Sequence, residues 1–137
     1  MHVRRIAALL SIGLVLPAAS HAQTCPIRGQ HPMTIVQLFF GQTVPGKGPL
    51  ASRTWHRFLK EVVTPRFPDG FTVLDGYGQW RAPGGLAIGR ERSKVIEIAA
   101  TNSPYLLKNI EDVASSYRAR FHQQSVGIVT LSGCGVF

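Results

Sequence analysis

The side chains best suited to chemistry lie in one stretch near the middle of the chain, residues 71–98. Gly76-Tyr77-Gly78-Gln79-Trp80-Arg81 is separated by the turn-forming Ala82-Pro83-Gly84-Gly85 from Arg90-Glu91-Arg92-Ser93-Lys94. Guanidinium groups bind carboxylates through paired hydrogen bonds, and an indole ring stacks on planar or cationic groups. Arginines close to a tryptophan are therefore typical of a site for a small anionic or planar ligand.

A tight turn near Gly84 predicts two paired strands, residues 71–81 and 86–98. The expected pairs are 80 with 88, 78 with 90, and 76 with 92, so that glycines face Arg90 and Arg92. Glycine inside a strand leaves room for a close approach by another group. Arg66, held between two prolines, is a further candidate for recognition. The expected ligand-binding residues are Trp80, Arg90, Arg92, Glu91, Tyr77 and Arg66.

The same residues also fit a purely structural interpretation. Alternating charges as in Arg90-Glu91-Arg92 occur on exposed strands, where each cross-strand ion pair contributes about 0.2–1 kcal/mol. Trp80 fits an ordinary core position. Turn chemistry explains every residue of Thr64-Pro65-Arg66-Phe67-Pro68-Asp69-Gly70 except Arg66.

Catalytic and metal-binding patterns are largely missing from the sequence. His31, His56 and His122 lack the spacing of metal ligands, so neither a metal nor a cofactor is expected. Glu91 lies between two arginines and should be ionised. Enzymatic activity remains an open question, with proton transfer by Tyr77, Glu91 or Arg66 as the enzyme hypothesis. A structural or interaction protein of the cell envelope is a third hypothesis.

The first 22 residues have the pattern of a secretory signal. Arg4-Arg5 precede an apolar run over residues 6–16, and Ser20-His21-Ala22 fits a cleavage site. A transmembrane helix needs about 20 apolar residues, and this run is too short to be one. The mature chain is therefore expected to have no transmembrane segment. The predicted location is periplasmic or secreted. The net charge is +8 for the whole chain and 13 − 7 = +6 once Arg4 and Arg5 are removed. In an exported protein this charge favours an acidic ligand, an anionic polymer or solubility over nucleic acid.

After an N-terminal arm over residues 23–32, residues 33–137 are expected to form one domain. Strand-forming residues cover 33–40, and an apolar stripe predicts a helix from Ala51 or Ser52 to Val63. A second helix begins after Ser103-Pro104 and fades near Gln124, and residues 125–132 read as the last strand. The stripe of the second helix consists of Leu106, Ile110, Val113, Ala114, Tyr117 and Phe121.

This order of elements predicts a ferredoxin-like βαββαβ fold of the α+β class. Right-handed crossovers then give an antiparallel four-stranded sheet of order 4-1-3-2, with two helices on one face. That order brings the start of the first strand beside the end of the last. Cys25 and Cys134 lie just outside those ends, which predicts a disulfide between them in an oxidising compartment.

The second face of this sheet should be apolar, because the strands are apolar on both sides. It is expected to carry Ile35, Phe39, Phe71, Val73 and Val95. Such a surface is rarely left exposed on a monomer, so we expect a homodimer packed sheet against sheet. A curled sheet that closes over its own cavity is the alternative.

Several short motifs resemble those of a known family. They are Leu38-Phe39-Phe40-Gly41, Trp55 with Phe58, the proline-flanked segment 64–70, Gly78-Gln79-Trp80-Arg81, and Arg90-Glu91-Arg92-Ser93-Lys94. Together they resemble a bacterial family of exported proteins, domain of unknown function 3574, over nearly all of the mature chain. The resemblance implies export and a single domain, and it brings no catalytic residues.

Overall fold

The computed structural model describes residues 24–81 and 84–137 of the chain. The expected leader, residues 1–22, lies outside them. The longest strands are β1 (His31–Gly41), β4 (Thr72–Arg81), β5 (Ile88–Ala100) and β6 (Gly127–Gly135). The helices are α1 (Ser52–Phe58), which continues into the π-helix η1 (Leu59–Val63), and α2 (Pro104–Phe121). Two short strands, β2 (Thr43–Val44) and β3 (Gly48–Pro49), pair with each other.

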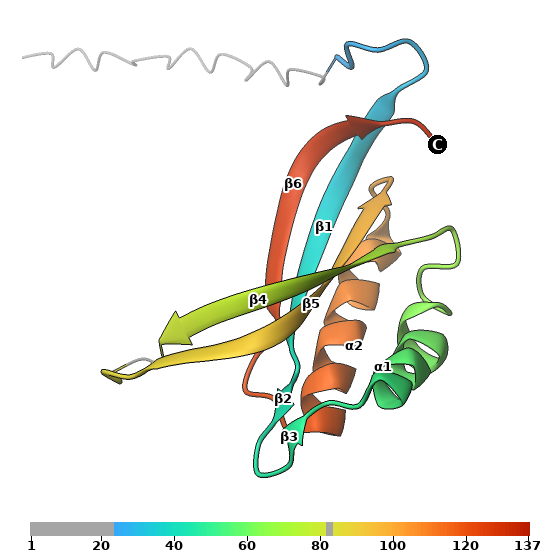
Figure 1. Cartoon of the computed structure of the whole chain (residues 1–137). Helices are drawn as coiled ribbons and strands as arrows, with labels where there is room; N and C mark the ends of the chain where they lie inside the picture. The colour runs from blue at the N-terminus through green and yellow to red at the C-terminus, as the bar shows by residue number, and fades with distance from the viewer. Residues whose placement is uncertain (1–23, 82–83) are drawn as a thin grey trace, which may run out of the picture.

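The long strands form one four-stranded antiparallel sheet in the order β4-β5-β1-β6. Both helices cover the same face of this sheet (Figure 1). We call this the helix face, and the other the open face. The expected α+β class, with two helices and an antiparallel four-stranded sheet, is confirmed.

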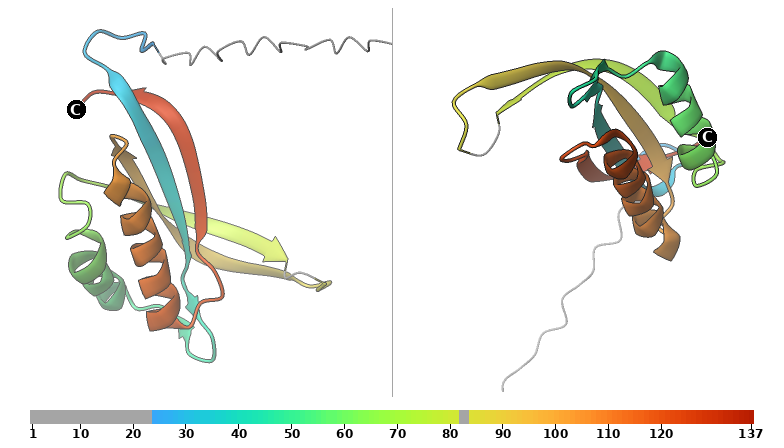
Figure 2. Two further views of the ribbon diagram at one scale, coloured as in Figure 1. Left: turned by 180° about the vertical axis from the view of Figure 1, so that it is seen from behind. Right: turned by 90° about the horizontal axis from the view of Figure 1, so that it is seen from below.

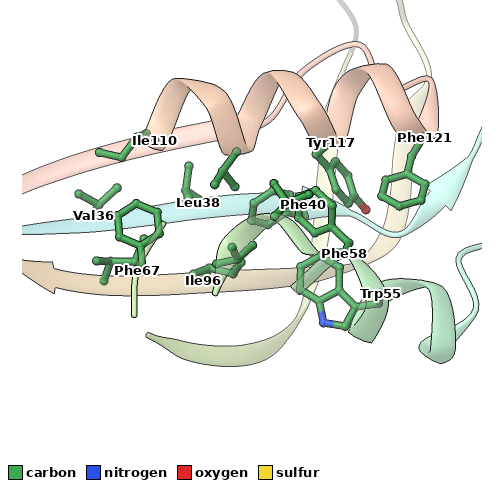
Figure 3. Close-up of a cluster of buried hydrophobic side chains, with 14 of the residues drawn as sticks. Val36, Leu38, Phe40, Trp55, Phe58, Phe67, Ile96, Ile110, Tyr117 and Phe121 are labelled. Carbon is green, nitrogen blue, oxygen red and sulfur yellow. The ribbon is translucent and has the colours of Figure 1, made fainter. Parts of the chain in front are cut away.

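The core lies between the helix face and the two helices. Alternate residues of β1 point into it, and Val36, Leu38 and Phe40 are completely buried. The predicted stripe of α2 is buried along its whole length, as expected. Figure 3 shows Phe40 among the aromatic rings of α1 and α2. Its ring centroid lies 4.7 Å from that of Tyr117 and 5.5 Å from that of Trp55, both in edge-on contact.

The first helix has the predicted extent but ends in an unpredicted way. Its last turn is a π-helix, in which the backbone N–H of Thr64 donates to the carbonyl of Leu59 at 2.8 Å. The wider turn lets the consecutive residues Val62 and Val63 both reach the core. Pro65 follows and ends the helix, because it has no N–H to donate.

The predicted disulfide between Cys25 and Cys134 is present, with its Cα atoms 5.7 Å apart. Cys134 is paired with Pro32 at the start of β1, which brings the N-terminal segment beside the end of β6.

The composition of the open face differs from the expectation at two positions. Phe71 and Val73 pack against the core instead, because Val73 is paired with Ile96, which points toward the helices. Leu74 takes the open-face position on β4 and is exposed. Ile35, Phe39 and Val95 share a side of the sheet with it, as the register requires.

Candidate functional site

The β4–β5 hairpin extends beyond the rest of the sheet. Strand β1 pairs with β5 as far as Ser93, and the N–H of Gln42 then donates to the Arg92 carbonyl at 2.9 Å, so residues 88–91 are paired with β4 alone. We call residues 77–81 and 86–92 the distal hairpin. It projects away from both helices in every view (Figures 1 and 2). Its two faces are therefore open to ligands or partners.

The pairing in this hairpin differs from the predicted one by one residue. Gly76 is paired with Ser93, Gly78 with Glu91, and Trp80 with Gly89. Six residues, 82–87, connect Arg81 to its partner Ile88, instead of the shorter turn expected. A shift of one residue moves side chains to the opposite face. The predicted placement of Gly76 and Gly78 opposite Arg92 and Arg90 is therefore wrong.

Glycines on the open face make room for large side chains of the neighbouring strands. A Cβ built on Gly89 would lie 3.2 Å from the Trp80 ring, and one on Gly127 would lie 3.2 Å from Phe39. Trp80 and Phe39 thus lie close over the backbone of these glycines, yet remain 50% and 37% exposed. A Cβ on Gly78 would have no neighbour within 4 Å, so the space above it is open.

These residues surround a cavity of about 510 Å³ on the open face. Trp80 and Phe39 are its aromatic members, and Gly78 and Gly89 border it from β4 and β5. The hairpin also contributes Gln79, Arg90, Glu91 and Ser93. The other lining residues are distant in the sequence, namely Gly41 at the end of β1, Thr43 and Pro45 after it, Gln123, Gln124 and Ser125 between α2 and β6, and Gly127 at the start of β6. A volume of this size, with aromatic walls and a few polar groups, is typical of small-molecule sites.

Glu91 supplies a carboxylate to this cavity and is held in place by the backbone. Its Oε2 accepts a hydrogen bond from the N–H of Thr43 at 3.0 Å. Its Oε1 lies 2.6 Å from where a Cβ on Gly41 would be, so only glycine fits there without moving it. A fixed carboxylate accepts hydrogen bonds from N–H or O–H groups of a ligand.

The strand end beneath Glu91 is fixed from the core side by Tyr117. The tyrosine hydroxyl donates to the Gly41 carbonyl at 2.7 Å and accepts from Nε2 of the buried Gln42 at 3.0 Å. Burial raises the pKa of Tyr117 well above its ordinary value, and the negative charge of Glu91 adds to this effect. Tyr117 therefore remains a hydrogen-bond donor at physiological pH.

The structure brings together part of the expected ligand-binding set. Trp80, Glu91 and Arg90 line the cavity, whereas Tyr77, Arg92 and Arg66 do not. By the alternation of the strands, Tyr77, Arg90 and Arg92 direct their side chains to the helix face. The cavity was not foreseen because its remaining lining comes from loops far apart in the sequence. The signal for it was the placement of glycines opposite large side chains.

Arg66 lies in a different region, where it joins the first helix to the second. Its Nη1 donates to the Val62 carbonyl at 2.9 Å, and its Nε lies 3.6 Å from Oδ2 of Asp112. Its own carbonyl accepts a hydrogen bond from Asn109. These contacts give Arg66 a role in helix packing.

Neither a group of metal ligands nor a membrane-spanning helix is found among the described residues. No group of three or more His, Cys, Asp and Glu side chains in 24–81 and 84–137 is arranged to hold a metal ion. Over the same residues, no helix has the length and apolar character needed to cross a membrane.

Comparison of the sequence with family descriptions identifies the relationship over most of the chain. Residues 36–137 match the family described as protein of unknown function (DUF3574). The chain belongs to this family. No curated protein matches its sequence significantly.

Known structures show a similar fold at low sequence identity. A phage SAM lyase in complex with S-methyl-5′-thioadenosine is similar with a TM-score of 0.56 and 15% identity, over 75% of this chain and 90% of that chain. The apo state of a phage SAM lyase gives 0.54 and 14%, over 85% and 98%. CPII, a nitrogen regulatory PII-like protein from Thiomonas intermedia K12, gives only 0.46 and 9%, over 79% and 97%. The first two similarities concern the fold alone.

Proposed function

We propose that this DUF3574 protein binds a small planar ligand bearing N–H donors in the open-face cavity. The observation that carries the proposal is the open space above Gly78, next to the half-exposed ring of Trp80. A flat ring that lies there covers a glycine backbone and contacts an indole. Stacking on an aromatic side chain provides affinity without requiring a particular ring.

The polarity of the cavity favours a hydrogen-bond donor over an anion. Of the described lining residues, only Arg90 and Glu91 are charged. Strand alternation directs Arg90 to the other face, whereas the Glu91 carboxylate is fixed beside Gly41. The ligand class is therefore a planar nitrogen heterocycle with amino or ring N–H groups, as in a nucleobase.

Titration calorimetry with adenine, S-methyl-5′-thioadenosine, benzamidine and benzoate tests this proposal. The second probe is included because one structure of similar fold holds it. We expect binding of at least one of the three nitrogen-bearing probes. Trp80→Ala and Glu91→Gln should each weaken that binding by about tenfold or more, as expected for a lost stacking or charged hydrogen-bond contact.

Arg92→Gln is the matched control. Arg92 lies on the helix face of the same strand and does not line the cavity. It should leave the affinity unchanged. Binding of benzoate alone, abolished by Arg92→Gln, would instead support an anion site. A complete lack of response to all four compounds would refute the proposal.

We also propose that the fold is ferredoxin-like. Counting only the long strands, β1, β4, β5 and β6 are the first to fourth, and the order β4-β5-β1-β6 reads 4-1-3-2 from the other edge. Export fits the Cys25–Cys134 disulfide, because such bonds persist in oxidising compartments. Mass spectrometry of the protein recovered from cell fractions tests export. An intact N-terminus in the cytoplasmic fraction would contradict it.

The remaining open face supports the proposal that a second copy covers it. Leu74, Val129 and Leu131 are exposed there, and the polar pair Gln37–Glu97 is satisfied internally by a hydrogen bond of 2.8 Å. Such an apolar area can be buried against its own copy in a two-fold dimer. We expect Leu131→Lys to shift the protein from dimer to monomer in analytical ultracentrifugation. A wild-type monomer at all concentrations would contradict this proposal.

A further inference from the structure

The helix face of the distal hairpin carries a basic surface, of which only Arg90 also borders the proposed cavity. Arg81, Arg90 and Arg92 are exposed and, by register, point to this same face. Within residues 24–81 and 84–137, none of them has an acidic partner within 4.0 Å, and the ion pairs present involve other cations. Their charge is therefore available to a partner.

Exposed apolar side chains occur in the same hairpin as these arginines. Leu86 is 95% exposed, and Ile88, the strand partner of Arg81, is 49% exposed. Tyr77 is 71% exposed opposite Arg92. A two-stranded hairpin that no third strand supports is only marginally stable in water. The exposed apolar side chains near the end of this hairpin therefore do not gain stability from burial in the fold.

We propose that the distal hairpin docks on the surface of a bilayer that contains anionic lipids. Leu86 and Ile88 would enter the interfacial region, and the arginines would bind head-group phosphates. Arginine is suited to phosphate because its guanidinium donates paired hydrogen bonds. Tyrosine at this depth has its ring in the apolar layer and its hydroxyl in water.

The charge pattern favours a lipid surface over other partners. A second copy of the chain also carries a net charge of +8 and the same arginines, so a contact there would bring like charges together. Nucleic acid would neutralise the arginines but leave Leu86 and Ile88 in water. An anionic bilayer satisfies both. The attachment would be peripheral, and it does not depend on the proposed ligand in the cavity.

Vesicle sedimentation with the full chain tests this proposal. Vesicles of phosphatidylcholine with phosphatidylglycerol are compared with vesicles of phosphatidylcholine alone, at low and high salt. We expect binding to the anionic vesicles only, and a strong decrease at high salt because charge interactions are screened. Arg81→Gln and Arg92→Gln should each reduce the partition coefficient about fivefold. Leu86→Asp should reduce it about tenfold or more.

Matched variants away from the hairpin separate docking from general adsorption. Arg53→Gln and Arg57→Gln remove the same charge from the exposed face of α1, and Leu107→Asp changes an exposed leucine of α2. All three should leave vesicle binding within about twofold of wild type.

Three results would overturn the proposal. Equal binding to neutral vesicles would show that the arginines are not used. If Leu86→Asp left the partition coefficient unchanged, charge attraction alone would explain the binding. A self-association that Leu86→Asp abolishes would assign the hairpin tip to a second copy.

Discussion

The two faces of the distal hairpin are built from the same two strands but have opposite chemistry. On the open face, Trp80 lies over Gly89 and the Glu91 carboxylate is held by the Thr43 N–H, next to a cavity of about 510 Å³. On the helix face, Arg81, Arg90 and Arg92 are exposed and have no acidic partner among the described residues. One face has a cavity with a carboxylate, and the other is exposed and basic.

This difference arises from the pleat of the strands. Neighbouring residues such as Arg90 and Glu91 point in opposite directions, so a sequence that alternates in charge separates the charges onto two surfaces. The backbone then separates the proposed ligand pocket from the proposed surface for anions. The experiments below test how independent the two faces are.

The largest effect is expected from Tyr117→Phe, which removes the hydrogen bonds that hold the end of β1 from the core side. The Gly41 carbonyl and the Gln42 amide would each lose a buried partner. We expect a loss of about 1–3 kcal/mol of unfolding free energy, measured by urea denaturation. Because the end of β1 next to Glu91 loosens as well, ligand binding should weaken, whereas vesicle binding should not change.

The pH dependence provides a second measurement on the same variant. The pKa of Tyr117 is raised in the folded protein above its ordinary value of 10.0, so its contribution to stability is present below pH 10 and is lost as the pH rises toward the folded pKa. The wild type should therefore lose stability above pH 10 more steeply than Tyr117→Phe. If both proteins lost stability equally steeply above pH 10, the pKa of the Tyr117 hydroxyl would not be raised by burial.

A smaller effect is expected from Gly41→Ala, which acts on the open face alone. The new Cβ would lie 2.6 Å from Oε1 of Glu91 and would displace the carboxylate from the Thr43 N–H. The expected cost is about 1–2 kcal/mol in urea denaturation, since one charged hydrogen bond is lost. Gly78→Ala is the matched control, because its Cβ would meet no atom within 4 Å. Equal stability of the two variants would contradict the described position of Glu91.

The smallest effect is expected from Arg81→Gln combined with Arg92→Gln on the basic face. Exposed residues without partners contribute little to folding, so the midpoint of urea denaturation should correspond to a change within about 0.5 kcal/mol. A larger loss would mean that these arginines stabilise the hairpin itself. In that case their availability to an anionic partner would be in doubt.

Periodicity in the sequence was sufficient to predict the helices and the sheet. The α2 stripe from Leu106 to Phe121 is buried as expected, and the strand β1 lies where apolar and β-branched residues predicted it. Apolar periodicity is a strong signal because it must match a buried surface over several turns or pleats. The disulfide followed from the position of the two cysteines at neighbouring strand ends.

The hairpin register could not be obtained in the same way. Around Arg90 both faces of the strand are polar, so no apolar pattern indicates which face is buried, and the register depends on the length of the loop. An error of one residue placed Arg90 and Arg92 with the glycines, whereas Glu91 and Ser93 are there. The cavity could not be predicted either, because its lining depends on this register and on two loops that are distant in the sequence.

The glycines of β6 have a consequence for how the sheet is assembled. Gly127, Gly133 and Gly135 form notches that receive Phe39, Ile35 and Met33 of β1. If β6 were shifted by two residues along β1, Val129 would take the position of Gly127 in one direction and clash with Phe39. In the other direction Leu131 would take the position of Gly133 and clash with Ile35. These contacts thus select the register of β6 against β1, and this register places Cys134 beside Cys25.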